Sequence, residues 1–503
     1  MRVHQKNDFN TFLKRLLFPL LAGIVIACSS LPSPKTEFRG VWIATVANID
    51  WPKNKGDNVE KQKADFLNLL DYYEGLNFNS MSVQVRTAGD AFYASELSPW
   101  SRFLTVTEGE HKAGFENVLQ WMIDQTHARG MHFHAWLNPY RATFDLDTTI
   151  LAKQHDFYQH RDWMVKYGKK YYYNPGIPTV WEHQSKVVEE VVQNYDIDGI
   201  HFDDYFYPYK VSGETFHDSL TFAQNGLPQQ NLEDWRRSNV DSLIKNVHRT
   251  IKSLKPWVQF GISPFGVWKN KATDPQGSDT KAGQTTYEDL YADPLLWMRQ
   301  EWVDYIVPQA YWSMDYPAAS HRKITEWWAN QNTNTKLYMG NGAYKVRNNA
   351  DKAWDNKQEL SKQLELSRST AKVEGNVFFS AKSLPQHQDV SKKIKRKFYQ
   401  GPIDTPVNSQ KTGRTISTPV IISNRTNAKK QDICISFYDS VPTFLSIYKR
   451  KTRNTHLPRL VKKVYLPAYE SQHCFELDYH SKKIEFAIKD AFGNESQPVL
   501  LTN

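Results

Sequence analysis

The sequence is poor in cysteine, and features that would define several classes of protein are absent from it. Only three cysteines, Cys28, Cys434 and Cys474, occur among its 503 residues. There is no internal repeat, and no apolar run is long enough to span a bilayer as a stable helix. The net charge is +9, but the basic residues are spread along the chain and no nucleic-acid-binding motif accompanies them. Specific nucleic-acid binding is therefore not expected, and the charge favours only a weak preference for anionic surfaces such as cell-wall polymer or lipid headgroups.

The start of the chain has the pattern of a bacterial lipoprotein signal. Basic residues precede an apolar segment at 16–27, which ends in the residues VIAC. We expect cleavage before Cys28 and attachment of lipid to that cysteine, so residues 1–27 are predicted to be a signal peptide and residues 28–36, rich in Ser and Pro, a tether. The expected location is the bacterial cell envelope, as a periplasmic or outer-membrane lipoprotein held to a membrane through Cys28.

From residue 38 onward, strand-like and helix-like segments alternate. This alternation predicts an α/β fold, a (β/α)₈ barrel of the TIM type over residues 37–400, rather than a doubly wound sheet. The long segments between the elements follow strand ends, where such a barrel carries its site. The candidate strands cover 38–46, 79–86, 131–138, 198–205, 258–265, 303–312, 336–344 and 375–382. The candidate helices cover 58–74, 114–129, 180–194, 232–254, 287–300, 320–330 and 351–370.

The character of the sequence changes after about residue 400. Residues 401–417 are rich in Lys, Thr and Ser and are predicted to be a linker. Short alternating strands follow, which indicate a small all-β sandwich of the fibronectin or immunoglobulin type over residues 418–503. Cys434 and Cys474 both fall in predicted strands of this sandwich. They either form a disulfide, as an oxidising compartment would allow, or are simply buried.

Residues 196–208, DIDGIHFDDYFYP, have the pattern of a buried parallel strand that ends in an active site. The hydrophobic run breaks at Asp203 and Asp204 and stops by Pro208. Two adjacent carboxylates among aromatic side chains resist ionising together, so one pKa rises and an acid stands beside a base. The structural alternative is that one aspartate caps the next helix and the other binds an arginine.

The other predicted strand ends combine hydrogen-bonding groups with aromatic rings. Aromatic residues make up 14% of the chain. This combination suits a polyhydroxylated ligand, whose hydroxyls need donors and acceptors while its ring faces need flat apolar surfaces. The predicted substrate-binding residues are Arg39, Trp42, Arg86, His134, Trp136, Asn138, Tyr140, Arg141, Tyr205, Gln309, Tyr311 and Trp312.

A metal site is a competing interpretation. His132 and His134 share one face of a predicted strand, and His201 with Asp203 would supply two more ligands, as in a barrel metallohydrolase. No further histidine lies convincingly at another strand end, and His132, deeper in its strand, also fits a core position. We therefore predict no metal and no cofactor, and keep a metal-dependent amidohydrolase or deacetylase as an alternative.

Six motifs in this order resemble the glycosyl-hydrolase-like 10 family of bacterial envelope proteins. They are FRGVWIATVANIDWP, HAWLNPYR, DGIHFDDYFYP, GISPFGVW, YADPLLW and VPQAYW, and the resemblance covers roughly residues 37–390. It implies a (β/α)₈ barrel, often on a lipoprotein, with glycoside hydrolase activity. For the substrate it implies peptidoglycan glycan strands that lack stem peptides.

Two mechanisms suit the paired aspartates. In the first, a 2-acetamido group of the glycan is the nucleophile, one aspartate orients that amide and the other protonates the leaving oxygen. In the second, Asp203 is the nucleophile and a distant carboxylate, Glu288, Asp293 or Asp315, is the acid. We favour the first, with His134 and Tyr311 binding the sugar and Trp42, Trp136 and Trp312 stacking on it. A lipoprotein that binds glycan without cleaving it is the alternative function.

Overall fold

The computed structural model describes residues 34–331, 333–406, 414–426, 430–450, 458–477 and 484–501. Cys28, the predicted signal peptide and nearly all of the predicted tether lie outside these residues. In the described part of the chain, no helix has both the length and the apolar character needed to cross a membrane.

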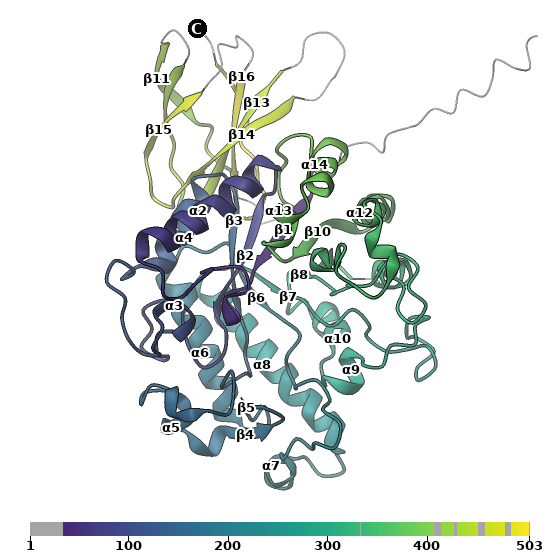
Figure 1. Ribbon diagram of the computed structural model, residues 1–503. Coiled ribbons are helices and arrows are strands. Elements are labelled where there is room, and N and C mark those ends of the chain that lie inside the picture. The colour runs from purple at the N-terminus through teal and green to yellow at the C-terminus, as the bar shows by residue number, and fades with distance from the viewer. Residues whose placement is uncertain are drawn as a thin grey trace, which may run out of the picture. The chain divides into compact units, whose positions relative to one another are not determined.

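Eight parallel strands close into a barrel in the order β1-β10-β9-β8-β7-β6-β3-β2 (Figure 1). Each strand lies within one of the predicted segments or overlaps it, so the predicted (β/α)₈ barrel is confirmed. The strands are β1 (Phe38–Ile43), β2 (Ser80–Arg86), β3 (His132–Leu137), β6 (Gly199–Phe202), β7 (Gln259–Ile262), β8 (Tyr305–Ile306), β9 (Lys336–Asn341) and β10 (Val373–Phe379).

Helices surround the barrel and bury one apolar stripe each against it. Good capping residues fix where several of them begin: the side chain of Asn58 accepts a hydrogen bond from the Lys61 amide at the start of α2, and Asn231 does the same at the start of α8. The main helices are α2 (Val59–Gly75), α4 (Val118–His127), α6 (Pro178–Asn194), α8 (Leu232–Leu254), α11 (His321–Ala329), α12 (Glu359–Ser369) and α14 (Gln388–Lys397).

The helix predicted over 287–300 is instead two short helices, α9 (Thr286–Asp289) and α10 (Pro294–Arg299). Pro294 cannot donate to a preceding carbonyl and occupies the first turn of α10, where its missing N–H costs nothing. Asp293 caps this second helix by accepting a hydrogen bond from the Leu296 amide. The apolar spacing continues across the break, which is why the pattern alone indicated one helix.

Two hydrophobic clusters build the barrel. The larger one lies between the strands and the helices and contains the outward-facing side chains of the strands, such as Val83, Ala135 and Ile200. The smaller one includes Phe38, Trp42, Trp136, Tyr305 and Tyr338, and the rings of Phe38, Tyr305 and Tyr338 contact one another. The polar side chains at the carboxy-terminal end of the barrel therefore lie over this smaller aromatic cluster.

The long segment after β3 contains a hairpin that the sequence did not suggest. Its strands are β4 (Met164–Tyr167) and β5 (Lys170–Tyr173), and Tyr172 of β5 forms an antiparallel bridge with Arg141. The hairpin lies on the carboxy-terminal side of the barrel strands, since it follows β3 and pairs with the residues that leave it. It is therefore placed beside the predicted site.

The C-terminal strands form two antiparallel sheets around a shared apolar core, as predicted. One sheet is β11 (Val420–Thr426), β12 (Gln431–Ser436) and β15 (Gln472–Leu477); the other is β14 (Arg459–Leu466), β13 (Thr443–Lys449), β16 (Ile484–Asp490) and β17 (Val499–Leu500). Cys434 and Cys474 face each other on β12 and β15 and are joined in a disulfide, which decides between the two predicted alternatives.

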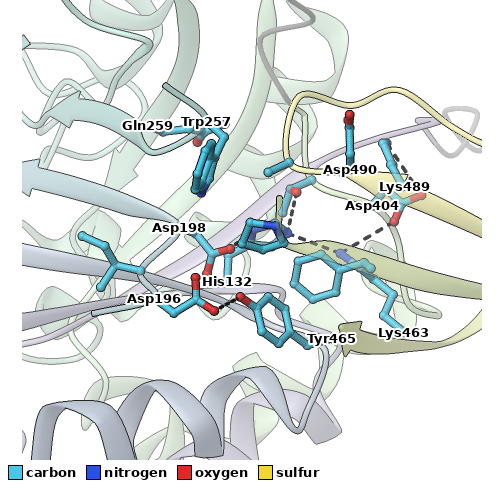
Figure 2. Close-up of a pocket in the computed structure, with 15 residues that line it drawn as sticks. His132, Asp196, Asp198, Trp257, Gln259, Asp404, Lys463, Tyr465, Lys489 and Asp490 are labelled. Carbon is cyan, nitrogen blue, oxygen red and sulfur yellow. Dashed lines mark hydrogen bonds and ion pairs between the residues drawn. The ribbon is translucent and has the colours of Figure 1, made fainter. Parts of the chain in front are cut away.

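The sandwich packs against the amino-terminal ends of β3, β6 and β7, and both belong to one compact unit, Lys35–Asn503. A small cavity of about 30 Å³ lies in this seam (Figure 2). Asp198 pairs there with His132 at 3.2 Å, and Lys463 lies 3.7 Å from Asp404. Asp404, from the predicted linker, also accepts a hydrogen bond from the Glu37 amide. The seam leaves the opposite, carboxy-terminal end of the barrel for the site.

Candidate active site

Asp203 and Asp204 directly follow β6, at the carboxy-terminal end of the barrel. Both side chains are buried, with exposed fractions of 4% for Asp203 and 2% for Asp204. Side chains alternate along a strand, so the pair can point toward one region only where the strand has ended. Here β6 ends at Phe202, and the amide of Phe206 turns back to the carbonyl of Asp204.

Asp203 is surrounded by donors. The side-chain amide of Asn138 donates to both of its carboxylate oxygens, at 3.0 and 3.1 Å, and the indole N–H of Trp136 donates to Oδ2 at 3.2 Å. Burial raises the pKa of Asp203, while the nearby Arg141 guanidinium and these two donors oppose that rise. The pKa of Asp203 is therefore raised overall, and these three groups are what favour its ionised form.

Asp204 has a different environment. Burial, together with the charge of Asp203, raises the pKa of Asp204 to about 7, although hydrogen bonds from Tyr209 and Gln309 act in the opposite direction. The Tyr209 hydroxyl donates to Oδ2 of Asp204. Two neighbouring carboxyl groups whose pKa values are pushed apart are the arrangement that separates an acid from a base. At neutral pH the pair can therefore hold one proton, on Asp204.

Aromatic side chains frame the two aspartates. Tyr205, Tyr311 and Trp312 are half-buried, so each keeps part of its ring at the surface. The Tyr311 ring lies 6.3 Å from Trp42 and 5.9 Å from Phe379, measured between ring centres. Together with Gln309, which donates to the Ser263 carbonyl at 2.8 Å, these residues present flat surfaces and an amide beside the carboxyl pair. This matches the ligand chemistry expected from the sequence.

Several neighbours of the pair were missed by the sequence analysis. Tyr209 lies in a run of aromatic residues with nothing to mark it out, yet it donates to Asp204. His201 accepts from the indole of Trp42 at 3.0 Å and is within 3.0 Å of the Ser263 hydroxyl. His201 was considered only as a metal ligand, whereas in the structure its hydrogen bond helps to hold the indole of Trp42 in place.

The structure contradicts the prediction that Arg39 binds substrate. It is the second residue of β1 and therefore lies at the amino-terminal end of the barrel, opposite the two aspartates. Its guanidinium pairs with Glu37 at 2.7 Å and donates to the Gly401 carbonyl at 2.8 Å. It ties the barrel to the segment that leads into the sandwich, a structural role that the motif did not distinguish from binding.

Three further predicted binding residues are buried in the framework. The Nδ1 atom of His134 lies 2.9 Å from the Tyr305 hydroxyl, and the His134 ring packs edge-on against Phe38, deep in the barrel. Arg86 has no exposed surface and donates to Ser98 and Tyr173. Tyr140 also has no exposed surface. In this conformation none of the three side chains can meet a ligand. They were predicted to bind because a position at a strand end does not tell which way the side chain points.

The histidines considered for a metal separate in the structure. His132 lies in the seam with Asp198, while His134 and His201 both contact the Tyr305 hydroxyl. Across the ranges that the structure describes, no three His, Cys, Asp or Glu side chains gather as a ligand set. The four side chains named for the metal-dependent alternative therefore do not form the site that it requires.

The distant carboxylates make local contacts. Asp293 caps α10 and accepts from the Trp268 indole at 3.3 Å, and Glu288 accepts from the Thr285 hydroxyl at 3.2 Å. The Asp315 side chain is 81% exposed and lies 3.6 Å from Arg322. None of these contacts involves Asp203 or Asp204.

A parallel eight-stranded barrel with paired carboxyl groups and aromatic rings at its carboxy-terminal end is the architecture of a glycosidase-like protein. The family model of Glycosyl hydrolase-like 10 matches residues 37–356, and the chain belongs to that family.

The chain is also similar to glycosyl hydrolases along most of its length. "Glycosyl hydrolase YngK" of Bacillus subtilis is 44% identical over 391 residues, which cover 76% of this chain and 75% of that protein. "Glycosyl hydrolase DigH" of Escherichia coli K12 is 37% identical over 420 residues, which cover 75% of this chain and 95% of that protein. Among solved structures, the PgaB (BpsB) glycoside hydrolase domain from Bordetella bronchiseptica aligns with a TM-score of 0.48 and 13% identity, covering 72% of this chain and 98% of that one.

Proposed function

We propose that this protein hydrolyses glycosidic bonds in an N-acetylated glycan of the bacterial cell envelope, with peptidoglycan as the leading substrate. The observation that carries the proposal is the unlike environment of two adjacent carboxyl groups: donors surround Asp203, whereas burial and a neighbouring charge keep a proton on Asp204. Glycoside hydrolysis needs this pair of states, one carboxylic acid and one carboxylate.

The adjacency of the pair favours substrate-assisted hydrolysis. Asp204 gives its proton to the leaving glycosidic oxygen as the bond to C1 breaks, and the acetamide oxygen of the same sugar attacks C1. Asp203 accepts a hydrogen bond from the acetamide N–H and stabilises the positive charge that develops on the amide. Water then opens the cyclic intermediate, and Asp204 takes up one of its protons and is restored as the acid.

The half-buried aromatic residues hold the sugar. Tyr205, Tyr311 and Trp312 offer ring faces for stacking, and Tyr311 packs against the buried cluster that contains Trp42 and Trp136. A glycan strand bound there would place one acetamide above Asp203. Binding of this kind also supports the second candidate function, a lipoprotein that holds glycan without cleaving it.

The proposed location is the cell envelope, with a lipid on Cys28. The support is the basic and apolar pattern that ends in VIAC at residue 28. Cys28→Ala should move the full chain from the membrane fraction to the soluble fraction. Retention of the variant in the membrane fraction would contradict the lipid anchor.

The test of function is release of sugars from peptidoglycan. Two preparations are compared, one intact and one stripped of stem peptides by an amidase, and products are identified by mass spectrometry. We expect release by the wild-type protein and a loss of about 100-fold or more in Asp203→Asn and Asp204→Asn, the scale of a lost general acid. Binding of the glycan without any release would instead identify a binding protein.

A further inference from the structure

One face of α14 carries positive charge that the proposed hydrolysis does not use. The side of this helix that faces the barrel contains the buried Val390 and Ile394. Positions three and four residues apart lie on the same face of a helix, and the face turned to solvent carries the exposed Lys392, Lys395 and Arg396. These three side chains are called the α14 cluster below.

The α14 cluster is not balanced by acids. Within the described ranges, no ion pair includes any of its three side chains. The acids nearest along the surface already have partners, since Asp389 lies 2.6 Å from Arg347 and Glu365 binds Lys397. Burial and the charges of neighbouring lysines lower the pKa of Lys393, on the same helix. The surface of α14 therefore has an excess of positive charge that a partner of opposite sign can neutralise.

The last turn of α14 lies where the chain enters the barrel. One nitrogen of Arg368 donates both to the Phe398 carbonyl at 2.7 Å and to the Glu37 carboxylate at 2.8 Å. Glu37 immediately precedes β1, so this is the amino-terminal end of the barrel, opposite the two aspartates. The exposed Arg459 of β14 donates to the Gln400 carbonyl at 3.3 Å and extends the positive surface beyond the helix.

The distance along the chain from Glu37 to Cys28 is short. Glu37 is nine residues after Cys28, and an extended chain spans at most about 3.5 Å per residue, or about 30 Å in all. A lipid on Cys28 would therefore hold the α14 cluster close to the membrane surface. At physiological salt, exposed charges act over only about 8 Å, so the cluster attracts headgroups strongly only when the helix rests against them.

We propose that the α14 cluster is a docking surface for a membrane of anionic phospholipids. The inference goes beyond the proposed hydrolysis and rests on the proposed lipid anchor only for the nearness of the membrane. Lysine and arginine side chains bind phosphate headgroups, and each such charge near an anionic bilayer strengthens binding about fivefold. Docking through this surface leaves the opposite end of the barrel, with Asp203 and Asp204, clear of the membrane.

The test measures vesicle binding by a chain that cannot be lipidated. A protein that begins at Ser29 lacks Cys28 and keeps the whole compact unit Lys35–Asn503. Its equilibrium binding is measured by cosedimentation with vesicles of phosphatidylcholine alone and with vesicles of equal parts phosphatidylcholine and phosphatidylglycerol. We expect binding to the anionic vesicles that weakens as salt is raised, and much weaker binding to the neutral ones. Equal binding to both kinds of vesicle would overturn the proposal.

Two triple variants separate a local surface from general charge. The first removes the α14 cluster by Lys392→Gln, Lys395→Gln and Arg396→Gln. It should bind the anionic vesicles about 100-fold more weakly, the product of three charges at about fivefold each. The control removes three exposed lysines from the segment after β3, at the other end of the barrel, by Lys153→Gln, Lys166→Gln and Lys169→Gln. It should bind as the wild type does, and equal weakening of the two variants would overturn the proposal.

Two further outcomes would give the cluster another role. Cations in the last turn stabilise a helix through its dipole, so lower thermal stability of the first variant with unchanged vesicle binding would leave only that role and overturn the proposal. Cluster-dependent binding to purified cell walls but not to vesicles would make wall polymer the partner and would also overturn it.

The outcomes distinguish the docking surface from the proposed function and from the lipid anchor. Sugar release from a soluble glycan by the first variant should equal that of the wild type, because the α14 cluster lies away from the aspartate pair. Vesicle binding without sugar release would support the docking surface and overturn the hydrolase, and sugar release without vesicle binding would do the reverse. A high-salt wash of membranes releases protein held by the cluster but not protein held by a lipid on Cys28.

Discussion

The side-chain amide of Asn138 joins Arg141 to Asp203. Its nitrogen donates to both carboxylate oxygens of Asp203, at 3.0 and 3.1 Å, and its oxygen accepts the Arg141 backbone N–H at 2.8 Å. The second hydrogen bond fixes which way the amide faces, so the nitrogen must point at the carboxylate. Asn138 has no exposed surface, and its role is to hold Asp203 in one orientation and in its ionised form.

Replacing Asn138 should therefore damage catalysis more than folding. Asn138→Ala removes the donor to Asp203, and we expect kcat to fall by about 10- to 100-fold, which corresponds to one hydrogen bond to a charged group. The acid limb of the pH–rate profile should also move to higher pH, because the ionised form of Asp203 loses support. Asn376→Ala is the matched control, a buried asparagine on β10 that bonds to Asn341 and Ser367. Equal loss of kcat in the two variants would contradict this role.

The pH dependence of hydrolysis follows from the same pair. Asp204 must carry a proton to act as the acid, and its pKa is raised to about 7, so the rate should fall as pH rises through that value. Asp203 must be ionised, so the rate should also fall at low pH. The initial rate measured from pH 4 to pH 9 should give a bell. A rate that keeps rising above pH 8 would contradict Asp204 as the acid.

Tyr209 sets the position of the alkaline limb. Its hydroxyl hydrogen bond lowers the pKa of Asp204, so Tyr209→Phe should raise that pKa and shift the alkaline limb upward, with the acid limb unchanged. The measurement is the pH–rate profile of the variant beside that of the wild type. Tyr195→Phe, at the far end of the barrel, should leave both limbs in place. A downward shift of the alkaline limb in Tyr209→Phe would show that the hydrogen bond acts in the other direction.

The raised pKa of Asp204 also predicts how stability changes with pH. In the folded protein Asp204 binds its proton more tightly than in the unfolded chain, where its pKa is near 3.8. The stabilisation is therefore complete below pH 3.8 and is lost as pH rises through about 7, at about 1.4 kcal/mol for each unit of difference. Asp204→Asn stays neutral throughout.

The midpoint of thermal unfolding of Asp204→Asn relative to wild type should accordingly rise between pH 5 and pH 8. Asp315→Asn removes a carboxyl that is 81% exposed and serves as the control for loss of charge. A constant difference across this pH range would show that Asp204 is ionised in both states.

Position along the chain was predictable, but the direction of side chains was not. Hydrophobic runs separated by helices indicated all eight barrel strands, and the break at Asp203 and Asp204 indicated where β6 ends, because a buried strand tolerates carboxyl groups only at its end. The same logic assigned Arg39 and Tyr140 to the site and was wrong. Arg39 begins its strand, and Tyr140 points into the core; the pairing of strands and the packing of loops decide both.

Contacts between distant segments could not be found from local patterns. The hairpin of β4 and β5 lies inside a long loop and has no strong alternation, yet it brings Lys170 beside Arg141. Tyr209 is only five residues from Asp204, but it reaches that carboxyl through a turn after β6 that no local pattern marks. Such pairs depend on tertiary structure, so a single sequence carries no signal for them.

The most direct test of the paired aspartates compares two leaving groups. An N-acetylated aryl glycoside has a leaving group that needs no proton, whereas a glycan strand needs one. We predict that Asp204→Asn loses about 100-fold or more on the glycan but stays within about tenfold of wild type on the aryl glycoside, while Asp203→Asn loses activity on both. Equal impairment of Asp204→Asn on both substrates, or full activity on the glycan, would contradict the account.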